Sequence, residues 1–318
     1  MYSYLVEHVF GPVPSRRLGR SIGVNNIPPK VCSYSCVYCQ LGRAIEMTAE
    51  RRRFFDPQDL CDETRAHLEA ARRRGEEVDY LTIVPDGEPT LDRGLGSLIS
   101  CLKDLGERVA LISNASLVAD PQVRQELAGL DWLSLKLDAA TPAVWKRIDR
   151  PHRRIDFAEM LNGMRFLAAA FEGTLTTETM LVEGVNDGIG ELERIAGILA
   201  ELHPYRSYIS VPTRPPAMKW VRPASEEVVA RACALFTEAG LHTETLIGYE
   251  GTAFAASGDA REDILSITAV HPLRHDAMEQ LLERDGAGSN VLGELLQTGK
   301  VVRVEYGDHA YYIRAFRR

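Results

Sequence analysis

The chain of 318 residues lacks any hydrophobic run that approaches the about 18–20 consecutive apolar residues needed to cross a bilayer. Its first residues, MYSYLVEHVFGPVPSRR, lack the pattern of a secretory signal peptide. Positive charge is not in excess either: the net charge is −8, whereas binding to nucleic-acid phosphates usually leaves a basic footprint. We therefore expect a cytoplasmic protein that is neither inserted in a membrane nor a nucleic-acid coat protein.

The rest of the composition is that of an ordinary globular protein, with 45% hydrophobic and 26% charged residues. The length alone predicts about two domains. An α/β barrel, however, can hold about 250 residues in a single domain.

The cysteines are unevenly distributed. Three of the six, Cys32, Cys36 and Cys39, fall within eight residues, while the other three are scattered: Cys61, Cys101 and Cys233. In an intracellular chain, clustered cysteines favour a metal or redox site over a disulfide scaffold. The scattered cysteines show no C-x2-C spacing, so we interpret them as small core residues and expect no second cluster.

The cysteine group lacks a fourth ligand for a structural zinc ion. No second cysteine pair follows it, and the one histidine pair with ligand spacing, His271 and His275, lies in a segment that we assign to another domain. Three thiolates without a fourth favour an iron–sulfur cluster in which one iron stays open. Zinc and chance spacing remain the alternatives at this point.

Buried-strand patterns alternate with helical patterns along most of the chain. Strands are expected at 21–25, 80–84, 109–113, 132–137, 174–182 and 207–211, and helices at 56–74, 92–105, 121–128, 141–148, 156–170, 189–202 and 225–239. Such alternation predicts βαβ units and a parallel sheet. Six units are too few to close an eight-stranded barrel, so we expect an open, partial (βα)6 TIM-like barrel with its site at the carboxyl ends of the strands.

The pattern changes after residue 250. We predict a barrel domain at 1–250, a linker at 251–258 and a small winged-helix-like α+β domain at 259–318, which ends in a hairpin with Gly307-Asp308 in its turn. Such a module binds nucleic acid, contacts a protein or covers a substrate. The last segment has eight basic and ten acidic residues, and its expected recognition helix at 291–297 carries Glu294 and no Arg or Lys. These charges disfavour DNA binding.

The segment Cys32-Ser33-Tyr34-Ser35-Cys36-Val37-Tyr38-Cys39 resembles the C-x3-C-x2-C signature of the radical S-adenosylmethionine (SAM) enzymes. The preceding segment, GPVPSRRLGRS at 11–21, resembles the branch of iron–sulfur oxidoreductases related to wybutosine-synthesis enzymes, and the resemblance covers roughly residues 10–250. It implies that Cys32, Cys36 and Cys39 hold three irons of a [4Fe-4S] cluster, with SAM on the fourth. A reduced cluster would then cleave SAM to methionine and a 5′-deoxyadenosyl radical, which abstracts hydrogen from a substrate.

Two motifs at strand ends resemble cofactor-binding motifs of that family. Asp86-Gly87-Glu88-Pro89-Thr90 is similar to its Gly-Gly-Glu-Pro motif, whose backbone and acid engage the methionyl ammonium, although a helix-capping turn is the alternative. Asp86 replaces the first glycine, which puts an uncommon backbone torsion there in doubt. Ser113-Asn114 ends the next strand, where the family places contacts to the methionyl carboxylate or ribose.

Further cofactor contacts are expected from two later strands. Alternation puts Lys136 and Asp138 on one face of their strand, where they form either a ligand contact or a structural ion pair. The segment that starts at Val182 resembles the one that flanks the adenine, and Tyr38 completes the expected cofactor-binding set. Arg214, between prolines at another strand end, is the substrate-contact candidate for an anionic group. No residue is predicted to be catalytic by itself.

We therefore expect a radical SAM enzyme that acts on a small molecule or peptide and receives electrons from a donor such as flavodoxin or ferredoxin. A tRNA-modifying enzyme of wybutosine-synthesis type is an alternative, although tRNA is not favoured. A winged-helix regulator with a redox-sensing cluster is a second alternative. A regulator would not need Glu88, Asn114, Lys136 and Asp138 to converge on a nucleotide-sized site.

Overall fold

A computed structural model describes residues 8–246, 258–270 and 272–315. Eight strands form one curved sheet in the order β1-β2-β5-β6-β7-β8-β9-β10. Their bounds are β1 Val9–Ser15, β2 Gly19–Val24, β5 Tyr80–Ile83, β6 Arg108–Ser113, β7 Trp132–Lys136, β8 Thr174–Met180, β9 Arg206–Ser210 and β10 Thr243–Leu246. The strand β1 is antiparallel to β2, and all other neighbours are parallel.

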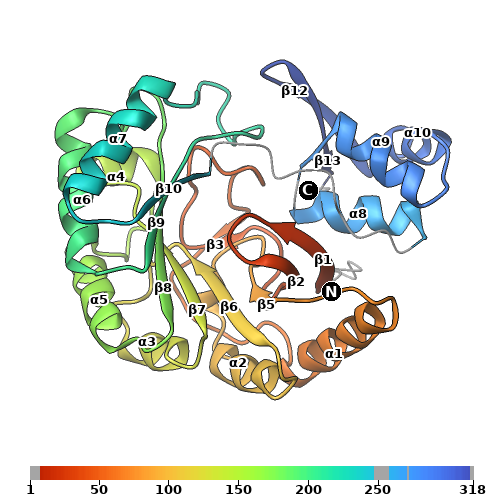
Figure 1. Cartoon of the computed structure of the whole chain (residues 1–318), viewed down its shortest axis with the longest axis horizontal. Coiled ribbons are helices and arrows are strands. Elements are labelled where there is room, and N and C mark those ends of the chain that lie inside the picture. Colours follow the sequence, from red (N-terminus) through yellow and green to blue (C-terminus); the bar gives the residue numbers. More distant parts are fainter. Residues whose placement is uncertain (1–7, 247–257, 271, 316–318) are drawn as a thin grey trace.

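The helices that link these strands lie on the outer, convex face of the sheet (Figure 1). They are α1 Pro57–Arg73, α2 Leu95–Lys103, α3 Pro121–Leu127, α4 Pro142–Ile148, α5 Phe157–Ala170, α6 Ile189–Glu201 and α7 Glu226–Glu238. Several begin where the sequence places an N-cap: the side chains of Asp56, Asp120 and Asp156 accept hydrogen bonds from the first turns of α1, α3 and α5.

The two faces of the sheet have different neighbours because side chains alternate along a strand. Leu111 and Leu133 belong to the main core, between the sheet and the helices. Ala110 and Trp132 belong to a second cluster, on the concave side. Lys136 is four residues from Trp132, so alternation directs it to the same concave side.

The expected partial barrel is confirmed, with two strands that the sequence patterns did not predict. The first is β1, which pairs with β2 and forms a hairpin, and the second is β10, which adds to β9. Within the described residues β1 and β10 lie at opposite ends of the strand order, so the sheet stays open. A short pair, β3 Val31–Cys32 and β4 Glu46–Met47, anchors the loop between them.

The C-terminal segment has its own core and its own sheet of three strands, ordered β11-β13-β12. Its elements are α8 Ala260–Val270, β11 Leu273–Arg274, α9 His275–Arg284, α10 Asn290–Gln297, β12 Val301–Tyr306 and β13 His309–Arg314. This module lies beside β1 (Figure 1), and Val13 of β1 packs against its core. Residues 251–257 of the expected linker lie outside the described residues, and the domain boundaries stay a prediction.

The prediction that Cys61, Cys101 and Cys233 are all core thiols is wrong for two of them. Cys61 of α1 and Cys101 of α2 form a disulfide with a Cα–Cα distance of 6.1 Å. They are 40 residues apart in the sequence, and only the packing of α1 against α2 brings them together. Cys233 is a free, half-buried thiol that packs against the main core.

No helix in the described ranges has both the length and the apolar character that crossing a membrane requires.

Candidate functional site

Cys32 ends β3, and Cys36 and Cys39 lie on the loop that follows this strand. Backbone hydrogen bonds hold this loop against the end of α4, because Val37 N donates to the Ile148 carbonyl (2.9 Å) and His152 N donates to the Ser33 carbonyl (2.8 Å). The Cys39 N–H donates to the Cys36 carbonyl at 3.2 Å, which tightens the last turn. The loop that carries the thiols is therefore held against the end of α4 and the residues that follow it.

The electrostatics of the thiols fit a group that brings positive charge. Burial raises the pKa of Cys32 to about 12, with a further contribution from Glu88, and burial followed by Asp149 raises the pKa of Cys36. Cys39 also contributes to the raised pKa of both Cys32 and Cys36. Buried thiolates in such surroundings need cationic compensation, which iron supplies.

The donor set of the loop fits an iron–sulfur cluster. Cys32, Cys36 and Cys39 are free cysteines, and thiolates are the usual ligands of such clusters. In a [4Fe-4S] cluster each thiolate binds a different iron, so three thiolates would hold three of its four irons.

Gly87 lets the cysteine loop approach the end of β5. A Cβ atom on Gly87 would lie 1.9 Å from the Val31 carbonyl oxygen, which precedes Cys32. Hydrogen bonds close this contact on both sides: Lys30 N donates to the Asp86 carbonyl (2.6 Å), and Glu88 N donates to the Val31 carbonyl (3.3 Å). Asp86 replaces the first glycine of the family motif, but it is not among the residues with positive φ. Its backbone therefore does not adopt the left-handed conformation that favours glycine.

Replacing Gly87 with alanine should therefore displace the cysteine loop. We expect lower iron content after reconstitution and a melting temperature reduced by several degrees, because overpacking typically costs about 1–3 kcal/mol. Iron per chain and thermal unfolding measure the two effects. Gly197→Ala is the matched control, because a Cβ on Gly197 of α6 meets nothing within 4 Å. Equal iron content in the two variants would contradict this account.

Glu88 joins three of the predicted site residues into one hydrogen-bonded group. It is 1% exposed; its Oε1 accepts from Ser113 Oγ (2.8 Å), and its Oε2 accepts from Asn114 N (2.8 Å). Thr90 donates twice more to Oε1, through N at 3.1 Å and Oγ1 at 2.5 Å. Pro89 follows as the first residue of a short 3-10 helix, Pro89–Leu91.

Asn114 connects this group to the cysteine loop. Its side-chain Nδ2 donates to Ser33 Oγ at 3.0 Å and lies 3.6 Å from Cys32 Sγ. The structure thus brings Glu88, Ser113 and Asn114 together beside the first thiol. Burial raises the pKa of Glu88, and its four donors oppose that shift.

Lys136 and Asp138 form a second group at the ends of β7 and β8. Lys136 Nζ lies 4.0 Å from Asp138 Oδ2, and the ammonium lies 5.0 Å from the centre of the Tyr38 ring. Tyr38 Oη donates to Asp138 Oδ2, and Met180 N donates to Asp138 Oδ1 at 2.7 Å. The predicted pair is therefore an ion pair in the structure, and it also contacts the cysteine loop through Tyr38. Its contact with a ligand stays a prediction.

Two acidic residues in this group escaped the sequence patterns. Glu178 of β8 pairs with Lys136 at 3.3 Å, and Asp149 Oδ1 accepts a hydrogen bond from Cys36 Sγ at 3.3 Å. Burial opposes the charge of Glu178, but Lys136 and then Arg17 hold its pKa well below the usual range. The available signal for Glu178 was an acid inside a strand of buried type, in the Thr-Thr-Glu-Thr segment.

The remaining predicted residues lie at the edge of these groups. Arg214 Nη1 donates to Gln40 Oε1 at 2.7 Å, directly after Cys39. Val182 is placed apart: its side chain is fully buried in the main core, and its N–H donates to Asn186 Oδ1 at 2.8 Å. Its expected role beside an adenine stays a prediction.

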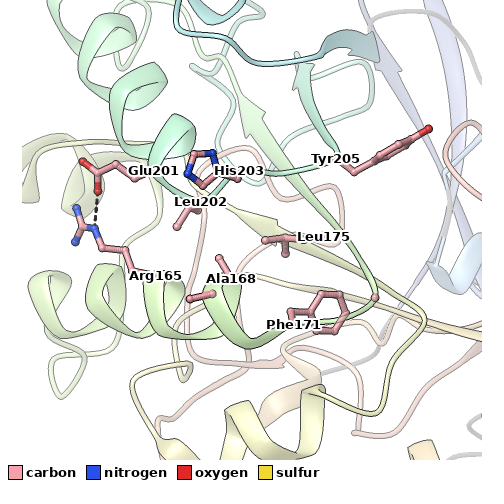
Figure 2. Close-up of a pocket in the computed structure, with 10 residues that line it drawn as sticks. Arg165, Ala168, Phe171, Leu175, Glu201, Leu202, His203 and Tyr205 are labelled. Atoms are coloured by element: carbon pink, nitrogen blue, oxygen red, sulfur yellow. Dashed lines mark hydrogen bonds and ion pairs between the residues drawn. The ribbon is translucent and has the colours of Figure 1, made fainter.

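A separate depression of about 300 Å³ lies where α5 and α6 end (Figure 2). Phe171 and Leu175 line it, and an ion pair from Arg165 Nε to Glu201 Oε2 (2.6 Å) borders it. It lies beside the amino end of β8, whereas sites in this type of sheet lie at the carboxyl ends. None of the chemically reactive groups described above lines this depression.

Comparisons with known proteins agree with this geometry. The family model described as the radical SAM superfamily matches residues 26–196, which include the cysteine loop and the Glu88 group. The UPF0026 protein MJ1312 of Methanocaldococcus jannaschii is 38% identical, over 96% of this chain and 95% of its own length.

Two solved structures share the fold. A radical SAM methyltransferase from Sphaerobacter thermophilus superposes with a TM-score of 0.56 at 17% identity, over 71% of this chain and 66% of that chain. A structure of TYW1 with a lysine-pyruvate adduct bound gives a TM-score of 0.52 at 17% identity, over 69% of this chain and 73% of that chain. At such identities these likenesses concern the fold alone.

Proposed function

The chain belongs to the radical SAM superfamily, whose enzymes use a [4Fe-4S] cluster and SAM, and from this membership we propose a reaction and a role for each site residue. Held by Cys32, Cys36 and Cys39, a reduced [4Fe-4S] cluster would supply the electron for cleavage of SAM to methionine and a 5′-deoxyadenosyl radical, which would take hydrogen from a small-molecule or peptide substrate. The protein supplies ligands, orientation and exclusion of water.

The observation that carries the proposal is the contact of Asn114 with both Glu88 and the cysteine loop. It supports a single site in which Cys32, Cys36 and Cys39 hold the cluster. Beside them, Glu88 and the Gly87 backbone would bind the methionyl ammonium, and Ser113 and Asn114 the carboxylate or ribose. The family resemblance carries the proposed roles of Tyr38, Pro89 and Val182. The cofactor contact proposed for Lys136 and Asp138 rests on their being a buried charged pair beside the cysteine loop.

We further propose that the substrate enters where the C-terminal module meets the barrel. Tyr306 Oη donates to the Pro212 carbonyl (2.9 Å) and Tyr311 Oη donates to the Thr213 carbonyl (3.0 Å), so the β12–β13 hairpin holds the loop that carries Arg214. These contacts support a module, at 259–318, that covers the site of a 1–250 barrel. The only acid of α10, Glu294, pairs with Arg261, and α10 has no basic residue for DNA.

The tRNA-modifying alternative has less support from the charges. The net charge of the chain is −8, and α10 carries no basic residue that could bind nucleic-acid phosphates. Burial lowers the pKa of Lys136, but Asp138 and Glu178 together raise it above the usual range. Lys136 is therefore suited to bind an anionic group.

Release of 5′-deoxyadenosine tests the proposed function. The reconstituted protein, reduced with dithionite and given SAM, should release 5′-deoxyadenosine and methionine, and flavodoxin or ferredoxin should replace dithionite as the donor. Full cluster content without any release, with or without candidate substrates, would contradict the enzyme and favour a redox sensor. A salt-sensitive shift with bulk tRNA would favour the RNA alternative.

A further inference from the structure

The N-terminal hairpin carries a charged side chain to the concave side of the sheet. Its turn, between β1 and β2, places Leu18 against Trp132 and Tyr208, and Leu18 is only 4% exposed. The neighbouring Arg17 forms an ion pair with Glu178 of β8, although the two residues are 161 positions apart. The hairpin (red in Figure 1) thus contacts strands from the other half of the sheet.

The two carboxylate oxygens of Glu178 bind different partners. Arg17 Nη1 binds Oε2, whereas Oε1 accepts from Ser210 Oγ at 2.9 Å and pairs with Lys136 Nζ at 3.3 Å. The side chains of Arg17 and Glu178 are only 18% and 9% exposed, so the ion pair between them has little contact with water. The Arg17 contact therefore sets the rotation of the carboxylate, and with it the direction from which Oε1 meets Lys136.

Lys136 connects Glu178 to the cysteine loop. Its ammonium is shared between Glu178 at 3.3 Å and Asp138 at 4.0 Å, and it faces the Tyr38 ring at 5.0 Å. Without Arg17, both oxygens of Glu178 would be available to Lys136, and the ammonium would move away from Asp138. A continuous series of contacts thus runs from Arg17 through Glu178 and Lys136 to Tyr38.

We propose that Arg17 is a positioning residue for SAM binding, which acts through Glu178 to hold Lys136 beside Asp138 and Tyr38. Arg17 itself does not touch the cofactor. This inference rests on the proposed function, because it takes Lys136 as a SAM contact. It gives a role to the SRR segment at 15–17, which the cluster and the strand-end motifs leave unexplained.

Three single variants test it on the cluster-reconstituted protein, with the SAM dissociation constant measured by equilibrium dialysis. Arg17→Gln should weaken SAM binding about tenfold, the size expected when the partner of a ligand-contacting group is lost. Iron content should stay at the wild-type value. Arg17→Lys should recover most of the affinity, because it restores a cation beside Glu178. Arg20→Gln, an exposed arginine of the same hairpin, should bind SAM like the wild type.

A double-mutant cycle with Glu178→Gln separates positioning from general destabilisation. If Arg17 acts through Glu178, adding Arg17→Gln to Glu178→Gln should not weaken SAM binding further. The double variant also removes the buried charge of Glu178, which Arg17→Gln alone leaves without its arginine partner. Fully additive effects, or unchanged affinity in Arg17→Gln, would overturn the inference. Lys136→Met separates the role of Lys136 from that of Arg17. If Lys136→Met leaves SAM affinity unchanged, the proposed role of Lys136 in SAM binding fails. If Lys136→Met weakens SAM binding strongly and Arg17→Gln does not, only the role of Arg17 is contradicted.

Discussion

Replacing Cys36 with alanine is expected to abolish the brown iron–sulfur absorbance and to reduce bound iron far below the wild-type content. Loss of a side chain that hydrogen-bonds to a metal ligand already weakens metal binding by about 10–100-fold, and loss of a ligand itself should do more. Cys36 is the middle of the three cysteines, and Asp149 accepts a hydrogen bond from its thiol, so alanine also removes this contact and leaves Tyr38 Oη, at 3.5 Å, as a donor to the same oxygen. Iron per chain and the visible spectrum measure the effect after anaerobic reconstitution.

Cys233→Ala is the matched control for this variant. Cys233 is also a free, half-buried thiol, but it lies on α7 and outside the cysteine loop. It should keep the full iron content and spectrum. A complete cluster in Cys36→Ala would refute the ligand assignment, and a loss of iron in both variants would show that the assay reports general misfolding.

Replacing Glu88 with alanine is expected to weaken SAM binding strongly while most of the iron is retained. A hydrogen bond to a charged group contributes about 1.5–3 kcal/mol, which corresponds to roughly 10- to 150-fold in affinity. The carboxylate accepts from Ser113 and Asn114, so its orientation next to Cys32 is set before the cofactor binds. Equilibrium dialysis with SAM and iron analysis on the same sample separate the two properties.

Alanine at position 88 also leaves the buried donors of Thr90 and Ser113 without an acceptor, which by itself lowers stability. Glu88→Gln keeps the shape and an oxygen that can accept from Thr90 and Ser113. Its amide nitrogen cannot accept from Asn114 N, so the variant removes the charge and one hydrogen bond while most of the group stays satisfied. Glu201→Gln, at the edge of the depression in Figure 2, is the control for removal of a carboxylate elsewhere. Wild-type SAM affinity in Glu88→Gln would contradict a charge-dependent role.

Local signals predicted most of the barrel. Helical patterns predicted helices at 56–74, 121–128 and 156–170, close to the observed α1, α3 and α5, and in each the preceding aspartate caps the first turn through hydrogen bonds to residues two or three positions away. Apolar runs predicted β5 and β7 because buried parallel strands need apolar residues on both faces. The strands β1 and β10 were missed: β1 contains two prolines, which weaken a strand pattern, and β10 is only four residues long.

The sequence by itself determined the cysteine spacing, the motif that contains Glu88 and the order of strands and helices, since each depends on residues that are close in the chain. Only the tertiary structure decided which side chains meet across the sheet. Arg17 and Glu178 are 161 positions apart, and Cys61 and Cys101 are 40 positions apart. Their contacts depend on how the sheet curves and on which helices pack side by side, and no local pattern records either property.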